Sequence, residues 1–123
     1  MWVFNKMLWA WLWAAVILVL TLMPGNDVPT WSWANTIHFD KFVHVVLFGG
    51  QAFLLGQALA VKGDPKKAFL VAMVVAIAYG GTIELLQGAM GMGRDADFFD
   101  LLADSVGAVI AFVILRMQER ARV

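Results

Sequence analysis

The chain has 123 residues, 62% of them hydrophobic, and a mean hydropathy of +0.78. A soluble chain of this length could not bury so much apolar surface, so the composition excludes an ordinary soluble domain and predicts a membrane protein. Nine basic residues balance nine acidic ones, and the absence of cysteine excludes disulfides, thiolate metal sites and cysteine nucleophiles.

Four apolar stretches divide the sequence, at residues 7–23, 42–59, 68–86 and 98–115. Each is near the ~17–25 residues that a helix needs to cross ~30 Å of hydrocarbon. The connections are short, and no linker, internal repeat or low-complexity tract separates the stretches. We therefore expect an all-α, polytopic membrane protein that forms one domain over residues 1–123, with a bundle of four transmembrane helices.

The distribution of Lys and Arg predicts the orientation of this bundle, because these residues accumulate in segments that stay in the cytoplasm. Seven of the nine cations lie before the first span, in the second connection or after the fourth span, where only two acidic residues accompany them. The opposite side has two cations and seven acidic residues. Both termini are therefore predicted to be cytoplasmic, with the first and third connections outside.

The first apolar stretch has two interpretations. Lys6 precedes it, as a basic residue precedes the apolar part of a cleaved signal peptide. The stretch is long for such a peptide, and residues 22–25 lack a convincing pattern of small residues for cleavage, so a retained span is preferred. Trp9 and Trp13 are four residues apart and share a helical face, which is expected to contact lipid or a neighbouring helix.

The second stretch opens with Asp40, Lys41 and His44. Asp40 can cap the helix and Lys41 can extend its ammonium group to the lipid headgroups, so both have ordinary structural explanations. His44 lies one turn deeper, on the same face as Asp40. It is interpreted as a functional residue, and a buried structural histidine is the alternative.

The third stretch contains Glu84 one turn inside its outer end. A carboxylate at this depth is costly and normally turns towards the interior of the bundle and a partner. Gln87, three residues further on, shares its helical face. Gly80 and Gly81 are expected to let a neighbouring helix approach closely.

The fourth stretch follows Arg94 and carries Asp97, Asp100 and Asp104 on one helical stripe. Asp97 as N-cap and Asp100 in the first turn both suit the positive end of a helix dipole. Asp104 lies about 10 Å beyond the cap at ~1.5 Å per residue, which is too deep for a capping role.

Three helices thus deliver polar side chains at a similar depth near the outer surface. We predict that these side chains form one polar pocket that opens outwards. The alternative is a network of salt bridges that only holds the bundle together. The predicted pocket residues are Asp40, Lys41, His44, Tyr79, Glu84, Gln87, Arg94, Asp97, Asp100 and Asp104.

The same residues stand in a distinctive order: Asp40-Lys41 with His44, Tyr79 with Glu84-x-x-Gln87, and Arg94-x-x-Asp97-x-x-Asp100 before Gly107. In this order they resemble the VanZ-like membrane proteins, a family named for an accessory protein of teicoplanin resistance. The resemblance extends from about Asp40 to Ala111. The family commonly has Asn at the position of Asp104 and Gly at that of Ala111. The resemblance implies a small integral membrane protein of the bacterial envelope, in the cytoplasmic membrane.

Two functions are compatible with these residues. A binding or accessory protein would use the acidic pocket to attract a cationic amine on a lipoglycopeptide or envelope lipid, and so modulate the envelope or teicoplanin susceptibility. A membrane enzyme would use His44, Glu84 and Asp100 as catalytic candidates, with a divalent cation that lets a lipid-linked phosphate approach. Whether the chain is an enzyme therefore stays open.

A transporter is disfavoured, because the charges lie at one end of unbroken helices and not at the membrane midplane. No cofactor is expected beyond the cation that the enzyme hypothesis would use. The expected partner is the lipid bilayer, with an envelope lipid or lipoglycopeptide as a possible ligand, and no nucleic-acid partner is expected. The oligomeric state stays open.

Overall fold

The computed structural model describes residues 2–22, 39–90 and 97–122. These residues form four long α-helices and no strand: α1 (Trp2–Leu22), α3 (Phe39–Ala60), α4 (Pro65–Met90) and α5 (Phe98–Ala121). Each helix contains a segment long and apolar enough to cross a membrane. The predicted all-α fold with four membrane-spanning helices is therefore confirmed.

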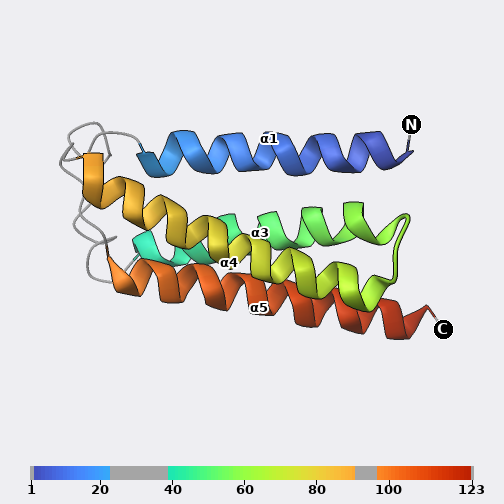
Figure 1. The fold of residues 1–123 in the computed structure, drawn as a ribbon. Helices are drawn as coiled ribbons and strands as arrows, with labels where there is room; N and C mark the ends of the chain where they lie inside the picture. The colour runs from blue at the N-terminus through green and yellow to red at the C-terminus, as the bar shows by residue number, and fades with distance from the viewer. Residues whose placement is uncertain (1, 23–38, 91–96, 123) are drawn as a thin grey trace.

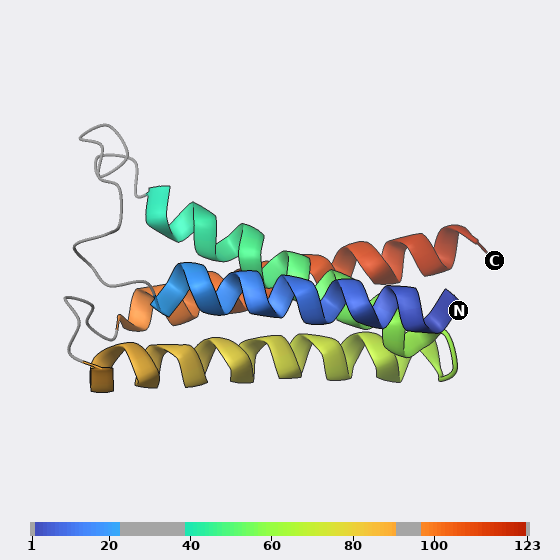
Figure 2. The same ribbon diagram turned by 90° about the horizontal axis from the view of Figure 1, so that it is seen from above.

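The four helices run along one another (Figure 1). The start of α1, the α3–α4 connection and the end of α5 lie at one end of the molecule. The start of α3, the end of α4 and the start of α5 lie at the other end (Figure 2). Lys62 of the α3–α4 connection, and Lys66 and Lys67 in the first turn of α4, are thus at the opposite end from Asp40, Glu84 and Asp100. Which end faces the cytoplasm stays a prediction.

Local sequence explains where α4 and α5 begin. Asp64 precedes α4, and its carboxylate accepts a hydrogen bond from the backbone N–H of Lys66 at 3.1 Å, while Pro65 takes the first helical position. Asp97 is the N-cap of α5, as predicted, and its Oδ1 accepts from the N–H of Phe99 at 2.8 Å. The cap of α5 places Asp100 and Asp104 on the turns that follow.

Small residues bring the helices together. α3 and α5 approach closely at Gly49 and Gly107, where a Cβ built on Gly49 would lie 3.1 Å from the carbonyl oxygen of Gly107. A second small-residue contact consists of Ala52, Ala76, Ala108 and Ala111. Such contacts let backbones meet inside a membrane, where lipid offers no hydrophobic advantage to larger side chains. They fix the spacing of the helices that carry the polar residues.

Gly107→Ala is expected to lower the free energy of unfolding by about 1–3 kcal/mol, a usual cost of overpacking. The added Cβ would collide with the carbonyl oxygen of Val45 and lie 2.9 Å from the backbone nitrogen of Gly49, and neither backbone atom can move aside cheaply. Gly81→Ala is the matched control, because its Cβ would lie 3.9 Å from Leu101 Cδ1, an ordinary contact. Unfolding with SDS in detergent micelles measures both. Equal stability of the two variants would contradict this account of the α3–α5 contact.

Candidate functional site

Lys41 joins three carboxylates at the end where α3 and α5 begin. Its ammonium nitrogen Nζ donates to Asp100 Oδ1 at 2.6 Å, and to Asp97 Oδ2 and Asp40 Oδ2 at 2.8 Å each. Asp97 and Asp100 are 56 and 59 residues away in sequence from Lys41. The ammonium group therefore ties the first turn of α3 to the first turn of α5.

One turn deeper, His44 lies between two carboxylates of α5. Its Nδ1 is 2.7 Å from Asp104 Oδ1, and its Nε2 is 3.5 Å from Asp100 Oδ2. The imidazole is buried and stacks on Phe48, with the ring centroids 6.2 Å apart and the planes tilted by 8°. Phe48 belongs to the apolar cluster beneath the site, so packing and hydrogen bonding together fix the orientation of the ring.

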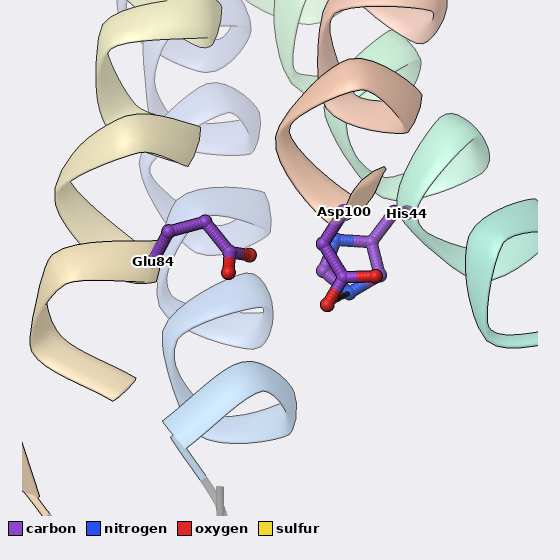
Figure 3. A group of neighbouring side chains, drawn as sticks. All are labelled: His44, Glu84 and Asp100. Atoms are coloured by element: carbon purple, nitrogen blue, oxygen red, sulfur yellow. Dashed lines mark ion pairs between the residues drawn. The ribbon is translucent and has the colours of Figure 1, made fainter. Parts of the chain in front are cut away.

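Glu84 reaches the same place from α4. Its Oε2 accepts a hydrogen bond from the backbone N–H of Asp97 at 2.9 Å, whereas its buried Oε1 has no hydrogen-bond partner among the described residues. Figure 3 shows the Glu84 carboxylate pointing across the bundle towards Asp100 and His44. One ligand atom from each of these three residues lies within 4.8 Å of those from the other two.

Asp104 is fully buried, and a glycine makes room for it. A Cβ built on Gly80 of α4 would lie 2.5 Å from Asp104 Oδ2. Gly80 thus allows close packing as predicted, but its neighbour is the Asp104 side chain and not a helix backbone, and Gly81 has no such close neighbour among the described residues. Asp104 Oδ2 has no hydrogen-bond partner among the described residues, whereas Asp104 Oδ1 contacts His44 Nδ1.

Tyr79 and Gln87 point to a different neighbour. The Tyr79 hydroxyl donates to the carbonyl oxygen of Ala14 at 2.6 Å, and Gln87 Nε2 donates to that of Thr21 at 2.5 Å. Both acceptors belong to α1. These two residues of the predicted pocket therefore hold α1 against α4. Their hydrogen bonds to α1 do not connect them to the carboxylates of Glu84, Asp100 and Asp104.

Two further polar residues were not identified as site candidates from the sequence. Trp13 Nε1 donates to the carbonyl oxygen of Leu47 at 2.7 Å, which adds a polar link between α1 and α3. Gln51 is buried within α3, its Oε1 has no hydrogen-bond partner among the described residues, and it lines an apolar cavity of about 800 Å³ beside α1 and α4. Gln51 could have been identified from the sequence, because it is a polar residue in the middle of an apolar span.

Seven of the ten predicted pocket residues are thus linked through direct contacts or close approach. Tyr79 and Gln87 bond to α1 instead, and Arg94 lies outside the described residues. We call these seven the polar site. Its members are Asp40, Lys41, His44, Glu84, Asp97, Asp100 and Asp104.

Negative charge exceeds positive charge in the polar site. Five carboxylates face one ammonium group and one imidazole. Carboxylates at membrane depth need a cation, a shared proton or a hydrogen-bond donor, because lipid cannot solvate them. The arrangement is therefore chemically suited to receive a further cation.

Lys41 changes the acidity of Asp97, which lies just before α5. The hydrogen bond from the Lys41 ammonium group lowers the pKa of the Asp97 carboxyl below its ordinary value. This pair therefore stabilises the fold above the ordinary pKa of aspartate, and the stabilisation is lost as the pH falls through the lowered pKa. The side chain of Asp97 is 39% exposed, so solvent screening keeps the contribution small.

Comparison with known proteins identifies the family of this chain. A family model described as VanZ/LLP1 matches residues 3–119, nearly the whole chain. No curated protein matches the sequence, and no solved structure matches the fold. The matched range includes nearly all of the four helices and every residue of the polar site.

Proposed function

Since the chain belongs to the VanZ/LLP1 family, we propose that its polar site acts at the outer face of the bacterial cytoplasmic membrane. There it modulates the cell envelope or reduces susceptibility to the glycopeptide teicoplanin. Four membrane-spanning helices make the chain a multi-pass membrane protein. The outer location follows from the predicted orientation, in which the lysine-rich end faces the cytoplasm.

The excess of carboxylates over cations in the polar site carries this proposal. Lys41 satisfies one oxygen each of Asp40, Asp97 and Asp100, but Glu84 Oε1 keeps no partner among the described residues. A site with this charge attracts a cationic amine on a lipoglycopeptide or on an envelope component. Binding at the membrane surface would then change how the antibiotic meets its target.

Drug susceptibility in a sensitive Gram-positive host tests this function. Cells that express the wild-type chain are expected to tolerate more teicoplanin than cells without it, with little change for vancomycin. Glu84→Gln, which removes a charge and keeps the shape, is expected to abolish the protection. Membrane levels of each variant are matched by quantitative immunoblotting before minimum inhibitory concentrations are compared.

Glu119→Gln is the matched control, since Glu119 pairs with Arg116 at the far end of α5. Protection should persist in this variant. A wild-type chain without any effect on teicoplanin would reject the glycopeptide role. Protection that survives Glu84→Gln at equal abundance would show that the polar site is not its source.

The proximity of His44, Glu84 and Asp100 favours a second candidate, a metal-assisted enzyme that hydrolyses or transfers a lipid-linked phosphate. A divalent cation would offset the carboxylates that otherwise repel such a substrate. Metal-dependent phosphate release from a lipid-linked phosphate, lost in His44→Ala, would support this candidate over amine binding. No release with any divalent metal would reject it.

A further inference from the structure

We propose that His44, Glu84 and Asp100 bind one Zn²⁺ ion, and that Asp104 holds His44 in the orientation that zinc binding requires. This proposal uses the same polar site as the proposed function and names the cation that the site takes. It does not depend on an effect on teicoplanin or on catalysis.

The spacing of the candidate ligand atoms suits a zinc ion. At bonds of about 2.0–2.1 Å, neighbouring ligand atoms of a tetrahedral zinc site lie about 3.3 Å apart. His44 Nε2 and Asp100 Oδ2 are 3.5 Å apart, close to that separation. One ligand atom of Glu84 lies within 4.8 Å of a ligand atom of each of the other two residues, so the flexible Glu84 side chain can supply the third ligand.

Glu84 supplies an independent indication that a ligand belongs here. The residue is 6% exposed, and its buried Oε1 has no hydrogen-bond partner among the described residues. The other oxygen is held by the N–H of Asp97, and the carboxylate points towards His44 and Asp100 (Figure 3). Leaving a buried polar atom unsatisfied costs about 1–3 kcal/mol, and more for a charged group. A metal ion bound to Oε1 would remove this cost.

Asp104 selects the form of His44 that can bind a metal. An ionised Asp104 accepts a hydrogen bond from Nδ1–H of His44, whose Nδ1 is 2.7 Å from Oδ1. The lone pair of the neutral imidazole then lies on Nε2, on the side of Asp100. A carboxylate behind a ligating histidine is a common device of metal sites, because it fixes the tautomer and strengthens the ligand.

Lys41 leaves the necessary oxygen of Asp100 available. The ammonium group binds Oδ1 of Asp100, whereas Oδ2 faces His44. A doubly charged ion would balance the charges of Glu84 and Asp100. The imidazole favours zinc over Mg²⁺ or Ca²⁺, which prefer sites made of oxygen atoms alone. Three protein ligands would leave a fourth position for water or for a ligand oxygen.

Zinc binding to the purified full-length chain in detergent tests the proposal. The protein should carry no polyhistidine tag, and a chelator should first remove bound metal. Titration calorimetry with Zn²⁺ is expected to show one equivalent bound per chain. Glu84→Gln should weaken binding at least about 100-fold, since it removes a ligand. Asp104→Asn should keep the stoichiometry and weaken binding by about 10-fold, as expected for a residue behind a metal ligand.

His38→Gln and Glu119→Gln are the matched controls. The first removes the other histidine of the chain, and the second removes a carboxylate from the opposite end of the bundle. Both should bind zinc within about twofold of the wild type, a difference near 0.4 kcal/mol. Circular dichroism and size-exclusion chromatography establish that each variant keeps its helices and its size, so that lost binding is not lost folding.

The competing state is a protonated His44 that bridges Asp100 and Asp104 without a metal. It predicts no stoichiometric zinc binding by the wild type, a result that would overturn the proposal. Equal binding by wild type and Glu84→Gln would also overturn it. If the chain binds zinc but gives no teicoplanin protection, the zinc site is supported and only the glycopeptide role is rejected.

Discussion

Lys41→Met is expected to destabilise the bundle by about 3 kcal/mol, at the lower end of the cost of breaking a buried charge pair. The ammonium group is the shared hydrogen-bond donor to Asp40, Asp97 and Asp100. Methionine keeps the apolar stem but leaves these carboxylates together without their cation. The side chain of Lys41 is 26% exposed, which places the expected cost below that of a fully buried pair.

Lys41→Arg and Lys62→Met separate loss of the cation from other effects. Arginine keeps the positive charge and should retain most of the stability. Lys62 is an exposed lysine of the α3–α4 connection, and its replacement should change stability by no more than about 0.5 kcal/mol. SDS unfolding in matched micelles gives all three values. A Lys41→Met protein within about 1 kcal/mol of the wild type would contradict the role of Lys41 as the link between α3 and α5.

The sequence predicted the helices well because apolar length is a strong constraint in a membrane. Each helix extends beyond its predicted apolar stretch at one or both ends, as α3 does at Phe39 and α4 at Met90. Hydrogen bonds within a helix continue into polar residues, so hydropathy alone places the ends too early or too late. Asp97 is the N-cap that its residue type predicted, because the capping rule is local.

The distance of Asp104 from the helix start correctly indicated that the residue is not a cap. The structure gives it two neighbours that the sequence could not reveal, His44 as a hydrogen-bond partner and Gly80 at its other oxygen. Both contacts cross from one helix to another. Their identification needs the rotation of each helix about its axis, which an apolar span of this kind leaves weakly determined.

For Gln87, the sequence predicted a neighbour that the structure does not give it. It was grouped with Glu84 because the two residues are three positions apart on α4. Helix α4 contacts α1, α3 and α5, so residues on roughly one face meet different neighbours. Gln87 meets α1 at Thr21, whereas Glu84 meets the start of α5 at Asp97. Spacing within one helix therefore does not decide which partner helix each side chain reaches.

The polar site brings together the two explanations that the sequence left open. Its contacts to Lys41 hold α3 against α5, which is the structural role of a salt-bridge network. Glu84 Oε1 has no hydrogen-bond partner among the described residues, and a network that only stabilised the bundle would not require such an unpaired atom. We therefore propose that the layer around Lys41 mainly stabilises the bundle, and that the deeper layer of His44, Glu84 and Asp100 binds a ligand.

Single-cysteine labelling in intact cells tests most directly whether the polar site faces the outside of the cell, as we propose. The chain contains no cysteine, so each introduced thiol is the only one in the protein. A membrane-impermeant maleimide is expected to label Thr30→Cys and Gly91→Cys in intact cells. Gly63→Cys and Ala121→Cys should react only after the membrane is permeabilised. The reverse pattern would place the polar site in the cytoplasm and contradict the account.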